Sequence, residues 1–263
     1  MLVDTHCHLD FNRFDPDRDQ VITRARESGL ERILNPGINL GSSQSAVTIS
    51  EKYPEVYSAV GVHPNDGLSW DSNTINRLRE LSNHPKVVAV GEIGLDFYRD
   101  RTPKELQIKI FIEQLELAAE LMLPVIIHSR DSMAEVLEIL ADWHKGLVNS
   151  HSILADRPGV LHSFSGNEKF AKQTRLLNFF IGITGPVTFR NASDLQDLVI
   201  RLPLQELLIE TDAPFLSPHP RRGKRNEPSN VRLVAEKIAE LHQEAYNTVT
   251  KITTANATRL FEW

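Results

Sequence analysis

Eight short apolar runs alternate with longer amphipathic stretches along the whole chain. Several runs, such as Val-Val-Ala-Val, are continuously apolar, which is typical of parallel strands that are covered on both faces. We predict strands at residues 2–5, 32–35, 57–62, 87–92, 125–128, 160–162, 179–184 and 207–210. The stretches between them, including 104–122, 132–144 and 228–242, place apolar residues at helical spacing.

Eight strands that alternate with helices form either a closed α/β barrel or an open doubly wound sheet. No Gly-x-Gly-x-x-Gly motif follows the first run, which counts against a dinucleotide-binding sheet. A length of 263 residues fits one barrel or two small domains. The irregular loops at 146–159 and 213–228 do not behave as domain linkers, because the alternation resumes or closes around each.

Composition excludes several classes of protein. The only cysteine is Cys7, so an intrachain disulfide is impossible. The N-terminus lacks a signal pattern and the longest apolar run, 121–127, is too short to span a bilayer, so we expect a cytoplasmic protein without membrane contact. A net charge of −6 argues against non-specific coating of nucleic acid, although a local positive pocket for a nucleic-acid end stays possible.

Two histidines lie two residues apart near the start of the chain, in the run Asp-Thr-His-Cys-His-Leu-Asp at 4–10. On a strand, His6 and His8 would share one face because side chains alternate. Zinc and similar ions favour imidazole ligands at about 2 Å. The run therefore predicts half of a metal site, and the alternative is an edge strand with two solvated histidines.

Further polar residues follow the ends of other predicted strands: His63 the third, Glu92 the fourth, His128 the fifth, His162 the sixth and Asp212 the eighth. In a barrel, the C-terminal ends of the strands converge at one end, where catalytic residues collect. Metal-type residues at so many strand ends therefore predict one shared site.

The candidate ligands suit two divalent metal ions bridged by Glu92, with His6, His8 and Asp212 on one ion and His128 and His162 on the other. Two such ions against two carboxylates leave about +2 for a phosphate or an oxyanion. Glu92 and Asp212 are the catalytic candidates, and Asp212 would accept a proton from the attacking water. Imidazole and carboxylate ligands suit Zn2+, Mn2+ and, less well, Mg2+.

Each ligand candidate also has a structural alternative. Glu92 could cap a turn and Asp212 could start a helix, while His128 and His162 could be hydrogen-bonded core histidines. Their common placement favours the metal site over these alternatives.

Two substrate-binding candidates lie beside the ligands. His63 contacts a substrate phosphate or braces the Gly-Val-His-Pro turn. Arg130 forms a fork to phosphate or a helix salt bridge. The basic run at 221–225 steers an anionic polymer or is a solvated loop.

Taken together, these residues resemble the TatD family of metal-dependent hydrolases, a branch of the amidohydrolase-like barrels. The matching pieces lie at 4–10, 61–64, 91–96, 124–131, 161–166, 185–189, 210–214 and 222–228. The resemblance implies a single (β/α)8 TIM-barrel domain over residues 1–263, two metal ions on the six candidate ligands, and hydrolysis of phosphodiesters in DNA, or sometimes RNA, from an end.

The sequence departs from the family pattern in three places. Ser163 stands where the family often has cysteine, and Ala213 where serine is common; neither is a ligand, so we expect little effect. The loop at 146–159 looks longer than usual and begins at the opposite end of the barrel, so we expect it to affect stability or assembly rather than chemistry.

Three functions compete. The leading hypothesis is an exodeoxyribonuclease that acts on DNA ends through a metal-activated water. The alternative is an amidohydrolase or esterase acting on a small amide, a lactone or an aminoacyl-tRNA ester, because the same water can attack a carbonyl. A non-catalytic binding protein is the third, but no candidate ligand is missing. DNA or RNA is the expected partner, and no obligate protein partner is indicated.

Overall fold

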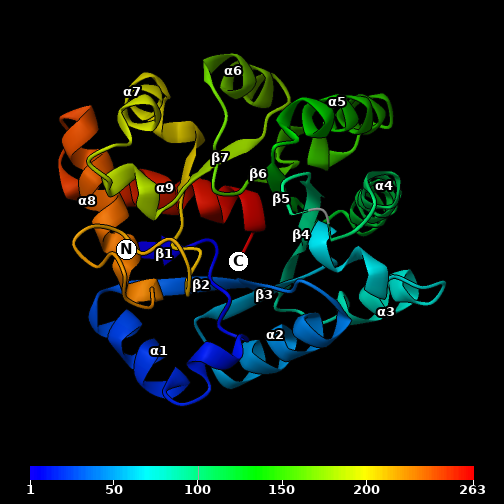
Figure 1. The fold of residues 1–263 in the computed structure, drawn as a ribbon, viewed down its shortest axis with the longest axis horizontal. Helices are drawn as coiled ribbons and strands as arrows, with labels where there is room; N and C mark the ends of the chain where they lie inside the picture. The colour runs from blue at the N-terminus through cyan, green and yellow to red at the C-terminus, as the bar shows by residue number, and fades with distance from the viewer. Residues whose placement is uncertain (100) are drawn as a thin grey trace.

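The computed structural model describes residues 1–99 and 101–263, and its eight strands form a nearly closed barrel with helices between them (Figure 1). Neighbouring strands pair in parallel from β1 through to β8. The strands are β1 (Leu2–Asp4), β2 (Leu30–Pro36), β3 (Val56–Val60), β4 (Val87–Asp96), β5 (Val125–Arg130), β6 (Gly159–Leu161), β7 (Phe180–Ile183) and β8 (Leu207–Ile209). The predicted (β/α)8 TIM barrel is confirmed.

The α-helices pack around the barrel: α1 (Arg18–Glu27), α2 (Leu40–Lys52), α3 (Thr74–Leu81), α4 (Lys104–Leu121), α5 (Met133–Asn149), α6 (Glu168–Leu176), α7 (Ser193–Arg201), α8 (Val231–His242) and α9 (Tyr246–Phe261). The predicted end of the fifth helix at residue 144 is wrong, because buried Leu147 extends its apolar face past Gly146. The loop predicted at 146–159 is correspondingly shorter. Within the described ranges, every helix is too short or too polar to cross a membrane.

Strand β4 runs further than its apolar run predicts. Val90 pairs with Val125 but Ile93 pairs with Ile127, so β4 holds one more residue than β5 in this interval. Such an irregularity redirects side chains. The predicted end of this strand at Glu92 is wrong, because its pairing with β5 continues past that residue. The strand continues to Asp96, and Gly94 permits the close approach, since a Cβ there would meet the His128 carbonyl oxygen at 2.0 Å.

The seam between β8 and β1 is fastened by loops beyond the strands. An isolated parallel bridge joins Cys7 to Ala213. The Asp212 amide donates to the His6 carbonyl at 2.8 Å, and Thr211 Oγ1 donates to Asp4 Oδ2 at 2.6 Å. Burial raises the pKa of Asp4 to about 8. The seam holds the two segments that carry His6 and Asp212 side by side.

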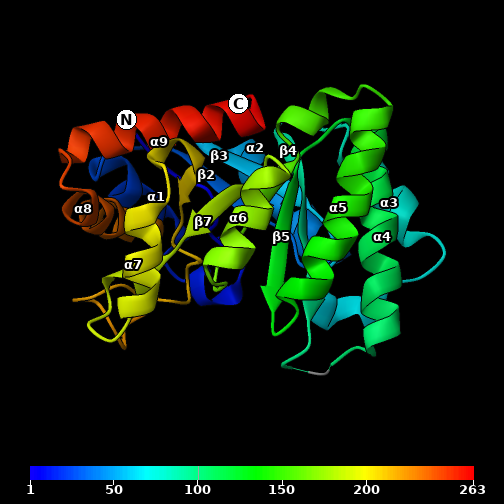
Figure 2. The same cartoon turned by 90° about the horizontal axis from the view of Figure 1, so that it is seen from above.

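Helix α9 covers the N-terminal ends of the strands. Figure 2 shows it lying across the end opposite to the tip of β5. Ala257, Leu260 and Phe261 are buried against apolar strand residues inside the barrel. Arg157 Nη1 donates to the Leu260 carbonyl at 3.1 Å, so the loop after α5 also lies at this end. The opposite, C-terminal end is left for a site.

Candidate metal centre

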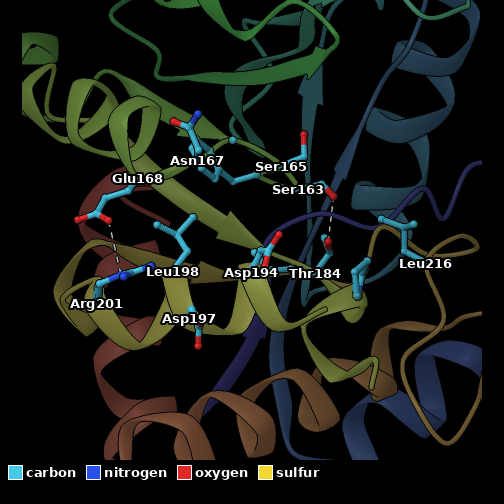
Figure 3. Close-up of a pocket in the computed structure, with 14 residues that line it drawn as sticks. Ser163, Ser165, Asn167, Glu168, Thr184, Asp194, Asp197, Leu198, Arg201 and Leu216 are labelled. Carbon is cyan, nitrogen blue, oxygen red and sulfur yellow. Dashed lines mark hydrogen bonds and ion pairs between the residues drawn. The ribbon is translucent and has the colours of Figure 1, made fainter. Parts of the chain in front are cut away.

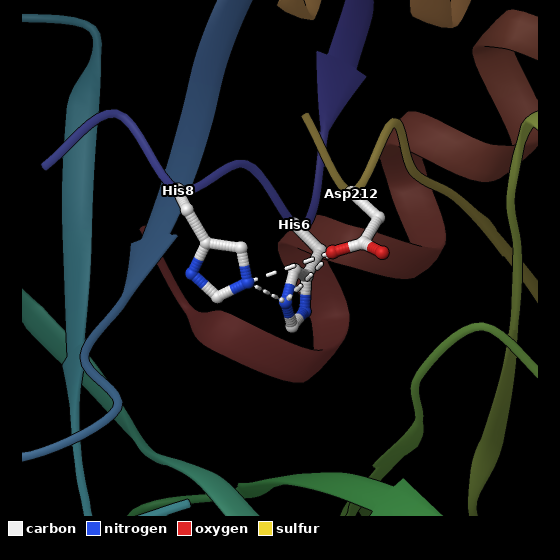
Figure 4. A group of neighbouring side chains, drawn as sticks. All are labelled: His6, His8 and Asp212. Atoms are coloured by element: carbon white, nitrogen blue, oxygen red, sulfur yellow. Dashed lines mark hydrogen bonds and ion pairs between the residues drawn. The ribbon is translucent and has the colours of Figure 1, made fainter. Parts of the chain in front are cut away.

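Four side chains converge at the C-terminal end of the barrel: His6 and His8 from the segment beyond β1, which ends at Asp4, Glu92 from β4 and Asp212 from the loop after β8. Nε2 of His6 and Nε2 of His8 are 3.2 Å apart. Glu92 Oε2 lies 3.4 Å from the former and 3.5 Å from the latter, while Asp212 Oδ1 lies 3.9 and 3.5 Å from the same two atoms. Figure 4 shows His8 and Asp212 both directed toward His6.

These distances fit a bound cation. Ligands about 2.1 Å from a tetrahedral zinc ion lie about 3.4 Å from one another. The observed separations between the ligand atoms, from 3.2 to 3.9 Å, lie on either side of that value. Burial lowers the pKa of His6, which keeps its imidazole neutral and its ring nitrogen able to bind metal. The donor set therefore suits a divalent metal ion.

A second group lies on the other side of Glu92. Glu92 Oε1 is 2.8 Å from His128 Nδ1 and 3.6 Å from His63 Nε2. His128 Nε2 lies 3.3 Å from Asp96 Oδ2, which also accepts a hydrogen bond from Asn65 Nδ2 at 2.8 Å. Burial works against a charged His128, but the Asp96 and Glu92 carboxylates outweigh it and raise the pKa of this histidine.

His162 is held between two carboxylates. Its Nδ1 lies 2.9 Å from Glu210 Oε2, while its Nε2 faces Asp212 Oδ1 at 3.8 Å. Its ring stacks on that of His6 with centroids 3.5 Å apart. Burial lowers the pKa of this histidine, but fully buried Glu210 more than compensates and raises it to about 9. A carboxylate behind a ligating histidine orients the ring toward a metal.

The described residues thus form three groups whose ligand atoms lie within 4.8 Å of one another: His6, His8 and Asp212; His6, Glu92 and His162; and His63, Glu92 and His128. The structure brings all six predicted ligands together. It does not group His128 with His162, as the predicted division between two ions would require; His162 lies instead with His6. The roles of these residues as ligands stay predictions.

Sequence reasoning missed three buried carboxyl groups of this region: Asp4, Asp96 and Glu210. A signal existed for two of them. Asp96 follows Glu92 by four residues on a strand, and Glu210 precedes Asp212 by two, which are spacings that share a face in extended backbone. The premature end assigned to β4 concealed the first relation.

The two predicted substrate-binding residues lie on the rim of the same centre. His63 Nδ1 accepts a hydrogen bond from the Asn65 amide at 3.0 Å, so it braces its turn while Nε2 faces Glu92. Arg130 ends β5, and its guanidinium lies 3.8 Å above the exposed ring of Tyr98. Among the described residues, no carboxylate forms a salt bridge with Arg130, and its contact with phosphate stays a prediction.

The loop after β8 is fixed from within by Asn226. Its buried Nδ2 donates to the carbonyl oxygens of Thr211 at 2.9 Å and Phe215 at 2.7 Å. The next residue, Glu227, accepts from Arg24 Nη2 at 2.6 Å. These two residues, which the sequence left without a role, position the segment that carries Asp212.

An α/β barrel that gathers histidines and carboxylates at the C-terminal ends of its strands has the architecture of a metal-dependent hydrolase. The comparisons with known proteins agree with this class. The family model described as TatD related DNase matches residues 3–262, and the chain belongs to the TatD family.

The relatives resemble the chain over almost its whole length. A Bacillus subtilis protein named uncharacterized metal-dependent hydrolase YabD is 42% identical over 99% of both chains. The 3'-5' ssDNA/RNA exonuclease TatD of Cronobacter sakazakii is 38% identical over 99% of this chain and 97% of its own. The crystal structure of YjjV, a TatD homolog from Escherichia coli K12, superposes with a TM-score of 0.91 at 32% identity, covering 100% of this chain and 98% of that one. The chain is a metal-dependent hydrolase of the TatD family.

Proposed function

We propose that this hydrolase cleaves phosphodiester bonds and shortens single-stranded DNA, or RNA, from an end. The observation that carries the proposal is the position of Glu92. Its Oε2 faces His6 and His8, whereas its Oε1 faces His128 and His63. A carboxylate with one oxygen toward each group of histidines suits a bridge between two cations, an arrangement that stabilises both the attacking and the leaving oxygen of a phosphodiester.

When bound, the two divalent ions would polarise a phosphate oxygen and lower the pKa of a water molecule. The chain's own residues supply the rest. Asp212 directs Oδ1 to His8 and His6, which leaves Oδ2 to take the proton of the attacking water. Arg130 sits on the β5 side of the centre, where a planar guanidinium can grip two phosphate oxygens. His63 and Asp96 hold His128 in place.

Relatives support the nucleic-acid substrate. The Cronobacter protein is named for exonuclease activity on single-stranded DNA and RNA, and the chain covers 97% of its length. The Bacillus protein is named only as a metal-dependent hydrolase. Both names describe hydrolases. Nuclease activity is the more specific property that we propose for this chain.

A second candidate is hydrolysis of a small ester or amide, and one observation favours it. A cavity of about 790 Å³ begins at Ser163, directly after His162, and is lined by Glu168, Asp194 and Asp197 (Figure 3). Carboxylates repel a phosphate polymer but tolerate a small neutral or cationic substrate.

One assay separates the two candidates. The protein is supplied with Mg2+, Mn2+ or Zn2+ and offered end-labelled single-stranded DNA and RNA beside a panel of small esters, lactones and aminoacyl esters. Stepwise shortening of the nucleic acid that EDTA blocks is the result we expect. Turnover of esters without shortening of either nucleic acid would overturn the nuclease proposal and favour the second candidate.

A further inference from the structure

Two phenylalanine side chains, Phe11 and Phe215, adjoin the metal centre on the side where β8 meets β1, and we call this pair the aromatic step. The ring of Phe11 stacks on His8 with centroids 4.7 Å apart. Phe215, on the loop after β8, meets Phe11 edge-on at 5.8 Å and lies 6.5 Å from His8. Phe215 is 43% exposed, although it is a large apolar side chain beside a polar centre. Each base of a single strand offers a flat face that can stack on such a ring.

The same loop carries surplus positive charge. A cavity of about 690 Å³ next to α1 and α8 is lined by five cationic side chains, Arg24, Arg221, Lys224, Arg225 and Arg232, and by two carboxylates, Glu227 and Glu236. Some of this charge is already neutralised: Arg225 forms two bonds of 2.7 Å to Asp17, and Arg24 contacts Glu227. In the described part of the chain, no carboxylate oxygen lies within 4.0 Å of the charged nitrogens of Arg221 or Lys224.

The aromatic step and the two unpaired cations belong to one braced segment. Phe215 is tied to Asn226 through its carbonyl oxygen at 2.7 Å. Ser217 Oγ donates to the Lys224 carbonyl at 2.6 Å. The outgoing and returning halves of the loop therefore run side by side. Their position relative to the centre is fixed, because Asn226 also bonds the carbonyl of Thr211, the neighbour of Asp212.

A second cavity, on the β6–β7 side of the centre, is acidic, and it reaches as far as Leu216 on the loop after β8. Beyond His162, the cavity in Figure 3 is lined by the exposed carboxylates of Glu168, Asp194 and Asp197 and by one cation, Arg201. That cation lies 3.7 Å from Glu168 and is partly neutralised by it. A polyanion that reaches the metal centre is thus repelled on the β6–β7 side and attracted on the side of β8 and β1.

We infer that the substrate strand leaves the metal centre across the β8–β1 rim, which we define as Phe11, Phe215, Arg221 and Lys224. The inference rests on the proposed function, and its occupant is single-stranded nucleic acid. Phe215 stacks with a base next to the scissile bond, and Arg221 and Lys224 contact the phosphates that follow. Because these contacts read no base edge, the rim binds strands of any sequence.

The first test removes both unpaired charges. In the metal-loaded Arg221→Gln/Lys224→Gln double variant, we expect kcat/KM for a labelled single strand of about a dozen nucleotides to fall at low salt, mainly through a higher KM. The plot of log affinity against log salt becomes less steep by about 1.4 when two phosphate contacts are lost, since each contact on a single strand contributes about 0.7 to the steepness. The loss should be greater for the long strand than for a trinucleotide.

A matched control removes two positive charges from the other end of the barrel. Lys145 near the end of α5 and Lys251 on α9 are both exposed. The Lys145→Gln/Lys251→Gln variant has the same net charge as the rim variant, and we expect wild-type kinetics and an unchanged salt slope. Equal slopes in the two double variants would overturn the inference, because the effect would then reflect net charge alone.

The second test concerns the aromatic step. We expect Phe215→Ala to raise KM for the long strand about tenfold and Phe215→Trp to restore it, because stacking needs a flat ring rather than phenylalanine itself. Bound metal is measured in each variant. An alanine variant that keeps its metal and its KM would exclude stacking on Phe215, and one that loses metal shows that the residue supports the centre instead.

The experiments distinguish an error in the inferred β8–β1 rim from an error in the proposed function. If wild-type protein with metal does not shorten single-stranded nucleic acid, the proposed function is wrong. If the wild type shortens the strand while the rim variants match it in KM and salt slope, the nuclease activity stands and the β8–β1 rim is wrong.

Discussion

Among single residues, Glu210 shows how much of this centre lies behind the side chains that face it. It is fully buried, yet it contacts His162 Nδ1 at 2.9 Å and accepts from the Ser163 amide at 3.0 Å. A buried carboxylate is costly unless such partners compensate for lost hydration. Its position therefore indicates a role in fixing the ring and the basicity of His162.

We predict that Glu210→Gln lowers metal affinity or activity about 10- to 100-fold, the usual effect of removing a carboxylate behind a ligating histidine. The amide keeps the shape of the side chain but loses the charge that raises the pKa of His162. Metal titration and turnover of a phosphodiester measure the effect. Glu206→Gln serves as the control, because Glu206 forms an ion pair with Arg175 on the surface. Wild-type metal affinity and turnover in Glu210→Gln would contradict the prediction.

Arg130 offers a prediction about substrate rather than metal. Its guanidinium is stacked on Tyr98 and has no ligand role in the groups described. We expect Arg130→Ala to reduce kcat/KM for phosphodiesters about 10- to 100-fold, the value of a charge-assisted hydrogen bond, without loss of bound metal. Arg130→Lys should recover only part of the activity, since an ammonium cannot form the fork. An equal fall in bound metal would show that Arg130 supports the centre instead.

The sequence allowed the residues of the centre to be predicted better than their grouping. Histidines and carboxylates at strand ends are visible in the sequence, and the structure gathers all six candidates. Their division is a matter of ring orientation, which depends on contacts such as the stacking of His162 on His6. Sequence spacing carries no information about that contact, so the pairing of His162 with His128 did not follow from it.

At the scale of elements, the apolar runs predict the eight strands but not where each one ends. Strand β4 shows why: after Val90 the sequence turns polar and glycine-rich, yet the strand continues to Asp96 because β5 pairs with it. The seam between β8 and β1 is equally hidden, since it depends on Asp4, Thr211 and loop amides rather than on an apolar pattern. Long-range pairing thus decides details that local pattern leaves open.

The loop after β8 yields a prediction about stability. Asn226→Ala removes four side-chain hydrogen bonds: Nδ2 donates to the carbonyl oxygens of Thr211 and Phe215, and Oδ1 accepts from the Glu227 amide and from Asn230 Nδ2. We expect the free energy of unfolding to fall by about 1–3 kcal/mol, measured by urea denaturation. Asn191→Ala, at an exposed position, should change it by less than about 0.5 kcal/mol. Equal stability of the two variants would show that Asn226 does not brace the loop.

At the scale of the whole molecule, the distribution of charge matters more for attracting a polyanionic substrate than the net charge does. The net charge of −6 repels polyanions in general. The structure nevertheless separates a cavity rich in cations, between the loop after β8 and helices α1 and α8, from a cavity rich in carboxylates on the β6–β7 side. The inferred path of the strand across the β8–β1 rim depends on that asymmetry, which the composition conceals because it averages both regions.

Metal binding at this centre is also coupled to folding of the whole barrel. The side chains of the centre come from β4 and β5 and from the segments that follow β1, β6 and β8, so unfolding separates them and releases any bound ion. An ion at 100 times its dissociation constant stabilises the folded state by about 2.7 kcal/mol for each site. We predict that Zn2+ or Mn2+ raises the free energy of unfolding of the EDTA-treated protein accordingly.

Glu92→Gln, which removes the charge shared by both groups of histidines, should abolish turnover and most of this stabilisation. A full metal-dependent gain in Glu92→Gln, or near-normal turnover, would place the cations elsewhere.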